Sequence, residues 1–415
     1  MEEKTISLGI GFATGRKNFR KVLNAYIYGW NESKKQKKIW NQVELTLFVA
    51  YDDSYSDATS TDFTNLNQEM VDTFQEIVFI GSKHAQREVL QIVKEEVLSQ
   101  RQVKQIFGSG YAGKRNAILY GAIEKKMDYL LFLDDDEYPV AVTKNEDTCL
   151  WSGQHVLPVH LSSIEHADIT NGHHCGYISP IPNIRYDQVL QEEDFRRFIQ
   201  AISNDIINWD SIKGLMNSGG VTYGNKEVLI QKEEISVREV QGCKFISGSN
   251  LCINLKDKSR SLPFYHPPGA RGEDTFLSTL LTNRTVIKVP CYTFHDGFAA
   301  YKHVLEGVLP IELDSIAPSS EVIVTRFLNA CIGWVRYKPL LLYLTRPGDY
   351  KDLFLSIQET LDQVVPKLCT YFQRKEFEEI STQFHKYCKT VEKHGRQFEQ
   401  VQAAWSVLMK QLDVD

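Results

Sequence analysis

Tyr129-Leu130-Leu131-Phe132-Leu133-Asp134-Asp135-Asp136 is the stretch of sequence that decides the fold, because five apolar residues run directly into three carboxylates. A short apolar run without alternation is typical of a strand buried on both faces, as in parallel sheets. In open sheets of this kind, ligands bind at the carboxyl ends of the strands. The three carboxylates are therefore expected at the ligand-binding edge of a sheet.

Clustered carboxylates at the end of a buried strand repel one another and lose hydration, so something must compensate them. A divalent cation is the simplest compensation. Hard oxygen ligands on a short turn suit Mg²⁺ or Mn²⁺, and a nucleotide diphosphate would complete the coordination sphere. The alternative is a solvated acidic turn that caps the next segment.

The first 140 residues alternate short apolar runs with amphipathic stretches. Strands are predicted at 6–12, 43–50, 76–80 and 129–133, and helices at 18–30, 84–99 and 113–126. This alternation indicates βαβ units and a parallel sheet. A second acidic loop, residues 51–57, follows the strand at 43–50, so both acidic loops are expected at the same edge of the sheet.

The rest of the chain is more mixed. Asn171-Gly172 lies between strand-like residues and predicts a hairpin. Further elements are expected as a strand at 244–254, a helix at 273–281 and a strand at 285–289, and the pattern is amphipathic and helical from about 319. The predicted fold class is α/β, with a mixed Rossmann-like sheet flanked by helices. The predicted domains are 1–310, catalytic, and 311–415, a C-terminal helical appendage.

The composition narrows the class of protein. Of the 415 residues, 42% are hydrophobic and 24% charged, as in ordinary globular proteins, and the net charge of −6 argues against a nucleic-acid partner. The eight cysteines form no CxxC pair, and the N-terminus lacks the pattern of a secretory signal, so a cytoplasmic location is expected. No apolar run is long enough to predict a transmembrane span.

Several motifs together resemble the family 2 glycosyltransferases of the GT-A fold. The helix start Lys114-Arg115-Asn116-Ala117, followed by the apolar strand and the acidic turn, is similar to that family's Arg-Asn helix start and DxD motif. The loop at 52–57 resembles its nucleoside-binding loop, except that Ser54 and Tyr55 replace the usual Gly and Ser. The segment at 272–277 is similar to its acidic motif. These matches occur in the family's order, over about residues 5–300.

The resemblance implies a metal-dependent transfer of a sugar from a nucleotide-diphosphate donor, with UDP among the expected nucleotides, to an unidentified acceptor hydroxyl, with inversion. It implies Asp274 as the general base. It implies that Asp136, Asp134 and His295 hold Mn²⁺ or Mg²⁺. The residues expected to contact the nucleotide sugar are Ala13, Thr14, Asp52, Asp53, Arg115, Asp134, Asp135, Gly248 and Ser249.

Each assignment also has a structural interpretation. Arg115 can be a surface arginine, Gly248 a bulge glycine and His295 a structural histidine. Glu273 and Asp274 can be first-turn residues that complement a helix dipole.

Two other functions compete with glycosyl transfer. Gly108, Gly110 and Gly113 fit the GxGxxG pattern of an NAD(P)-dependent oxidoreductase, and Asp134 follows at a suitable distance. Against it, the preceding residues 102–107 are too polar for a central buried strand. The other alternative is a non-catalytic module that binds sugar nucleotides.

The C-terminal region is expected to bury an apolar face rather than to hang free. Its apolar residues recur at helical spacing, as in Phe327, Leu328, Cys331, Ile332 and Val335. This face is expected to cover the catalytic domain or to build a homodimer through the C-terminal helices.

Overall fold

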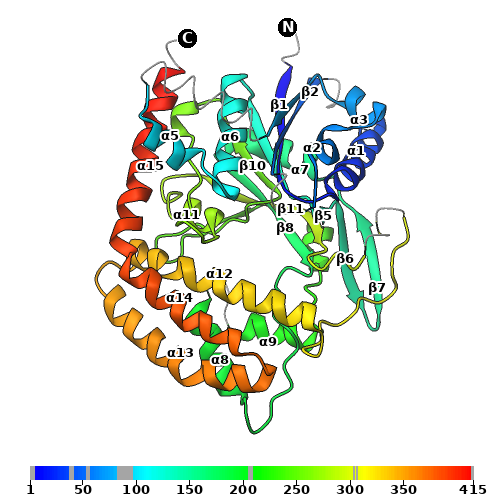
Figure 1. Ribbon diagram of the computed structural model, residues 1–415. Coiled ribbons are helices and arrows are strands. Elements are labelled where there is room, and N and C mark those ends of the chain that lie inside the picture. Colours follow the sequence, from blue (N-terminus) through cyan, green and yellow to red (C-terminus); the bar gives the residue numbers. More distant parts are fainter. Residues whose placement is uncertain are drawn as a thin grey trace.

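The computed structural model describes residues 5–36, 42–52, 57–81, 97–203, 209–301, 304 and 307–412. Its centre is one mixed sheet in the order β3-β2-β1-β4-β10-β8-β11-β5, with β9 paired to β11, and β6 and β7 form a separate hairpin (Figure 1). The strands are β1 (Ile6–Thr14), β2 (Val43–Tyr51), β3 (Glu76–Ile80), β4 (Tyr129–Leu133), β5 (Glu137–Tyr138), β6 (Val140–Asn145), β7 (Thr148–Gly153), β8 (Ile169–Gly176), β9 (Ile235–Ser236), β10 (Leu251–Asn254) and β11 (Val286–His295).

Parallel pairing joins β3, β2, β1 and β4, and β10 runs antiparallel to both β4 and β8. The helices are α1 (Phe19–Gln36), α2 (Ser60–Thr64), α3 (Gln68–Thr73), α5 (Gln100–Ile106), α6 (Tyr111–Glu124), α7 (Val156–Ser163), α8 (Glu192–Ile202), α9 (Trp209–Asn217), α10 (Lys226–Gln231), α11 (Glu273–Ser278), α12 (Glu321–Thr345), α13 (Tyr350–Phe372), α14 (Glu378–Lys389) and α15 (Val391–Gln411). The predicted mixed α/β class with a C-terminal helical region is confirmed.

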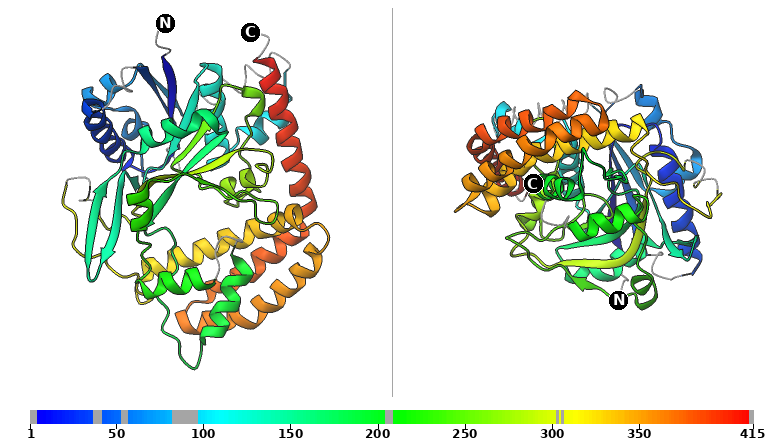
Figure 2. Two further views of the ribbon diagram at one scale, coloured as in Figure 1. Left: turned by 180° about the vertical axis from the view of Figure 1, so that it is seen from behind. Right: turned by 90° about the horizontal axis from the view of Figure 1, so that it is seen from below.

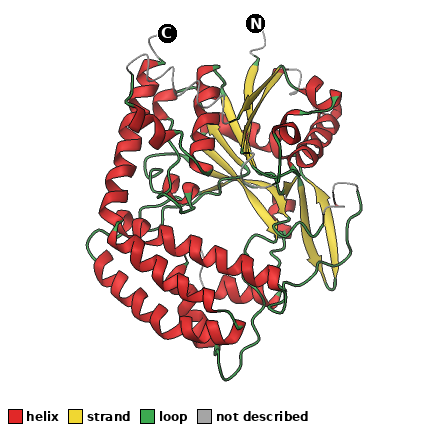
Figure 3. Cartoon of the chain, viewed as in Figure 1, coloured by secondary structure: helices red, strands yellow, loops and turns green. Residues whose placement is uncertain are grey.

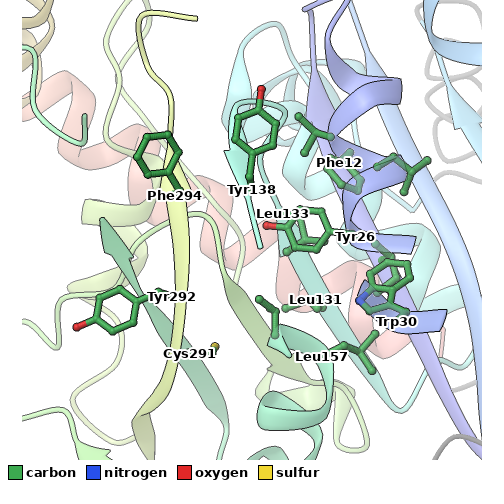
Figure 4. Close-up of a cluster of buried hydrophobic side chains, with 14 of the residues drawn as sticks. Phe12, Tyr26, Trp30, Leu131, Leu133, Tyr138, Leu157, Cys291, Tyr292 and Phe294 are labelled. Carbon is green, nitrogen blue, oxygen red and sulfur yellow. The ribbon is translucent and has the colours of Figure 1, made fainter. Parts of the chain in front are cut away.

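Strand β4 is buried on both faces, which explains its unbroken apolar run. Leu131 and Leu133 point into the cluster beneath α1 and α7, whereas Leu130 and Phe132 point into the cluster on the side of α6 and α15. Figure 4 shows the first cluster, where side chains of β1, α1, β4 and β11 meet. The glycine at position 11 lets α6 approach β1, because a methyl group there would lie 2.8 Å from Cγ2 of Ile118.

A layer of helices lies on one side of the sheet, as Figure 3 shows by colour and Figure 2 from behind and from below. Its core combines two distant parts of the chain, α8 and α9 from the middle and α12, α13 and α14 from the C-terminal region. The expected apolar face of α12 is buried here, through Phe327, Leu328, Cys331 and Val335. The C-terminal region therefore packs on the rest of the protein, as predicted.

The last helix, α15, leaves that layer and returns along the sheet region beside α5 (Figure 1). Its Trp405 is fully buried and donates a hydrogen bond from Nε1 to Oγ of Ser261, at 3.1 Å. No helix in the described residues is long and apolar enough to cross a membrane.

The hairpin predicted at Asn171-Gly172 is wrong, because both residues lie inside the continuous strand β8. Gly172 serves a close approach instead of a turn: a methyl group there would lie 1.9 Å from Nδ2 of Asn250. The strand predicted at 244–254 is confined to β10, and the residues before it form an irregular loop. The helix predicted at 84–99 lies mostly outside the described residues.

Replacing Trp405 by alanine should lower the free energy of unfolding by about 3–5 kcal/mol, the usual cost of deleting a buried Trp side chain. Urea unfolding followed by circular dichroism measures this change. Val407→Ala on the same helix is the control, because Val407 is 44% exposed and its truncation should stay within about 0.5 kcal/mol. Equal losses in the two variants would contradict the packing of α15.

Candidate functional site

A cleft of about 940 Å³ lies between the sheet and α12. The carboxyl end of β4, the end of β11 and the start of α11 form one wall, and one face of α12 forms the other. Charged and aromatic side chains dominate its lining, including Arg16, Tyr111, Arg115, Asp134, Asp135, Asp136, Tyr138, Arg271, Glu273, Asp274, His295, Phe298, Arg326, Trp334 and Tyr337. The sequence-predicted acidic turn and acidic motif thus meet in one cleft.

The three carboxylates of the acidic turn have different partners. The Asp135 carboxylate is buried and accepts hydrogen bonds from Oγ1 of Thr14 at 2.6 Å and from Nη1 of Arg16 at 3.0 Å. The Asp136 carboxylate forms an ion pair with Arg16 and lies 3.2 Å from Nε2 of His295. The Asp134 side chain is 30% exposed and contacts Arg115 at 3.3 Å.

These partners give the three carboxyl groups of the turn different pKa values. Burial, together with the neighbouring carboxylates, raises the pKa of Asp134 to about 8 although Arg115 opposes the shift. Burial also raises the pKa of Asp135. For Asp136 the effect of burial is outweighed by His295 and Arg16, which hold its pKa well below the usual range. Asp136 is therefore the member of the turn whose ionised form the protein favours most strongly.

His295 is oriented by the backbone. Its Nδ1 lies 2.6 Å from the carbonyl oxygen of Tyr177 and must donate to it, which turns Nε2 toward Asp136. Metal-binding histidines are held in this way, with the second ring nitrogen fixed by a carbonyl. Burial alone would lower the pKa of His295, but Asp136 and Glu137 raise it to about 9.

These residues fit a divalent cation that keeps part of its coordination for other ligands. No group of three or more His, Cys, Asp or Glu side chains with metal-binding geometry occurs among the described residues. One carboxylate and one imidazole, Asp136 and His295, are nevertheless a donor set that a hard cation accepts when waters and substrate phosphates supply the rest.

Arg115 is not a surface arginine. Its guanidinium is buried and packs over the rings of Phe132 and Phe264, with the central carbon 5.2 Å and 5.7 Å from the ring centroids. It contacts Asp134 and, at 3.3 Å, Glu273, and it donates to the carbonyl of Gly248. A single side chain thus connects the acidic turn with α11 and the loop before β10.

Asp274 stands in the first turn of α11. Its carboxylate accepts hydrogen bonds from the backbone N–H of Gly248 at 3.2 Å and of Thr275 at 2.8 Å. Burial, and then the charge of Glu273, raise the pKa of Asp274 to about 6. Glu273 is paired with Arg115. Asp274 also lines the cleft, but no cationic side chain among the described residues contacts it directly.

The other residues expected to contact the nucleotide sugar do not line the cleft, as far as the structure describes them. Asp52 is paired with Lys114 at 2.9 Å, and Asp53 lies outside the described residues. Ala13 and Thr14 are buried, the first in the core and the second beneath Asp135. Ser249 is also buried and donates to Glu137, which places it behind the acidic turn.

Sequence patterns assigned no role to several residues that line the cleft. Arg16 follows β1 directly, and its position at a strand end was a usable signal. Arg271, Arg326 and Trp334 lie on the loop before α11 and on α12, far from the motifs in sequence, and no local pattern marks them.

The dinucleotide-binding alternative lacks its structural context. That motif requires a strand directly before the glycines, whereas the helix α5 precedes Gly108. Here the glycines serve packing: a methyl group at Gly113 would lie 1.8 Å from the carbonyl oxygen of Gly108.

Comparison with known proteins adds little. No family model and no curated protein matches the sequence. Among solved structures, the crystal structure of mouse xyloside xylosyltransferase 1, in its apo form, is similar over 47% of this chain at 11% identity, with a TM-score of 0.21. The match spans 58% of that chain, which is less than two thirds of its length. A similarity this low assigns no function, so the function is inferred from the residues of the cleft.

Arg115→Met should lower the free energy of unfolding by about 3–5 kcal/mol, because it removes a buried guanidinium and leaves Glu273 and the partly exposed Asp134 without their counterion. Chemical denaturation at pH 7 measures the change. Lys114→Met is the matched control: its pair with Asp52 lies nearer the surface, and its loss should cost less than about 1 kcal/mol. A small effect of Arg115→Met would contradict the structural role of this arginine.

Proposed function

We propose that this protein is a metal-dependent glycosyltransferase that moves a sugar from a nucleotide-diphosphate donor to an acceptor hydroxyl. The proposal rests on one observation: two acidic sites with different surroundings line the same cleft. One is an acidic turn with an oriented histidine beside it, and the other is Asp274, a separate carboxylate with a raised pKa.

The donor would lie along the carboxyl ends of the parallel strands. Asp52, held by Lys114 next to the end of β1, would accept hydrogen bonds from the nucleoside. Asp134 is the most accessible carboxylate of the turn and would accept from the ribose or from a metal-bound water. These contacts are compatible with UDP as well as with other nucleotides.

Asp136 and His295 would hold Mn²⁺ or Mg²⁺. The cation would supply Lewis-acid chemistry, by offsetting the negative charge that develops on the departing diphosphate. Arg16, which contacts both Asp135 and Asp136, places a fixed positive charge at the same end of the cleft.

Asp274 would remove the proton from the acceptor hydroxyl as that oxygen attacks the anomeric carbon, in line with the leaving group and with inversion. Two backbone N–H groups fix its carboxylate, and neither can give up its proton to it. A pKa of about 6 leaves the carboxylate mostly ionised at pH 7 while keeping it a better base than an exposed aspartate.

Metal dependence is the first test of this proposal. Calorimetric titration with UDP, GDP and their sugar conjugates should show binding that Mn²⁺ strengthens, and Asp136→Asn should remove the strengthening. A donor hydrolysis assay with Mn²⁺ distinguishes the transferase from a module that only binds. Full activity in excess EDTA would rule out the role of the metal.

Replacing the base should separate binding from turnover. Asp274→Asn keeps the shape and most hydrogen bonds, so donor binding should persist while the transfer rate falls by about 10²–10⁴-fold. Glu321→Gln is the control, because Glu321 lines the cleft from α12 and has no assigned role in the reaction. Normal turnover in Asp274→Asn would place the base elsewhere.

The rate should also depend on pH. The base acts in its ionised form, so the rate should be at its plateau above the pKa of about 6 and should fall roughly tenfold per unit at lower pH. A pH profile of kcat at saturating donor, from pH 4.5 to 8, measures this. A profile that stays flat down to pH 5 is incompatible with Asp274 as the base.

A further inference from the structure

Two arginines that line the cleft have no anionic partner in direct contact among the described residues. Arg326 projects from α12 and Arg271 from the loop before α11, and both line the cleft. Within the described parts of the chain, no ion pair or hydrogen bond joins either guanidinium to another residue. The two other arginines of the cleft, Arg16 and Arg115, are both paired with carboxylates.

Arg326 is held in a defined position. Its guanidinium lies over the ring of Phe298, 4.6 Å from the centroid, and is partly buried. It also lies against Gly297, where a methyl group would be 2.5 Å from Nη2 of Arg326 and 2.8 Å from Cε1 of His295. The cation therefore lies next to the histidine of the acidic site, although it comes from the helical region.

The nearest carboxylates are engaged elsewhere. Asp136 pairs with Arg16 and His295, and Asp296 accepts the backbone N–H groups of Ala300 and Tyr301 at 3.0 Å and 2.8 Å. Removing a guanidinium from water without giving it an anion costs free energy. An anion bound in the cleft would offset this cost, because it would form charge-assisted hydrogen bonds with the guanidinium.

Arg271 adds a second positive charge to the cleft. Its aliphatic stem packs on α12 at Gly333, where a methyl group would lie 3.6 Å from its Cδ. Arg271 precedes Glu273 and Asp274 in sequence, so it lies at the end of the cleft where the acceptor would meet the base. Burial lowers the pKa of Arg326, and the charges of Arg16 and Arg271 lower it further, so Arg271 and Arg326 act on a common region of the cleft. Such a pair of guanidinium groups matches a phosphate group, which accepts several N–H donors at once.

We propose that Arg326 and Arg271 form a phosphate-binding site in the cleft, between α12 and the loop before α11. The proposal rests on the proposed function, because it assumes that this cleft binds the substrates. The phosphate belongs either to the diphosphate of the donor or to a phosphorylated acceptor, and both share the same chemistry. The helical region is then part of the substrate site.

The experiment uses the full-length protein in EDTA, so that no metal contributes. Isothermal titration with inorganic pyrophosphate, UDP, glucose 6-phosphate and glucose compares the wild type with Arg326→Gln, Arg271→Gln and Arg326→Lys. Arg196→Gln is the control for loss of one charge, since Arg196 is exposed on α8 and pairs with Glu193 outside the cleft. Circular dichroism confirms that each variant is folded.

The expected result is a loss of affinity for phosphate-bearing probes of roughly 10-fold to 100-fold in Arg326→Gln and a smaller loss in Arg271→Gln. The affinity of Arg326→Lys should lie between those of the wild type and Arg326→Gln, because lysine keeps the charge but lacks the paired N–H donors of a guanidinium. Losses confined to pyrophosphate and UDP assign the phosphate to the donor, and losses confined to glucose 6-phosphate assign it to the acceptor.

Two outcomes overturn the site: wild-type protein that binds none of the phosphate probes, or affinities in both glutamine variants equal to that of Arg196→Gln. A separate assay of nucleotide-sugar hydrolysis with Mn²⁺ keeps the two proposals apart. Hydrolysis without an effect of the arginines on phosphate binding refutes the site alone. Phosphate binding through the arginines without any hydrolysis or transfer refutes the proposed function alone.

Discussion

The carboxylates of Asp134, Asp135 and Asp136 emerge from a strand that is buried on both faces, and the positions of the surrounding cations follow from this concentration of negative charge. Water cannot screen the turn fully, so fixed positive groups must lie close by. The chain provides them from three separate elements: Arg16 after β1, Arg115 on α6 and His295 at the end of β11. Each of these elements borders the carboxyl edge of the sheet.

Arg115 extends this network beyond the acidic turn. Because its guanidinium also contacts Glu273 and the carbonyl of Gly248, the turn, the loop before β10 and the start of α11 are fixed relative to one another. Glu273 is neutralised by this contact, whereas Asp274 beside it keeps a raised pKa. The buried cation thus pairs directly with only one of two adjacent acidic residues, and burial and the charge of Glu273 raise the pKa of the other.

Sequence patterns predicted those features that depend on neighbours along the chain. The run 129–133 and its acidic end identified the central strand, and the amphipathic pattern at 18–30 identified α1. Patterns failed where the reason for a residue lies far away. The sequence around Gly172 resembled a turn, but a glycine is needed there because the side chain of Asn250, on another segment, occupies the space of a Cβ. Arg326 carries no local signal, since only tertiary packing brings α12 opposite the acidic turn.

The helical layer has a consequence for how the protein is made. Phe195 and Phe198 of α8 are fully buried, and the ring of Phe195 packs 6.2 Å from that of Phe327 on α12. A ribosome synthesises α8 long before α12, and at ordinary translation speeds the interval is on the order of 10 s. For that time Tyr186 and Trp209 are available to pack on Phe195, but the part of the α8 face that α12 covers lacks this partner. The nascent chain therefore passes through a stage in which α8 exposes apolar surface, and a chaperone bound there would protect the chain from aggregation.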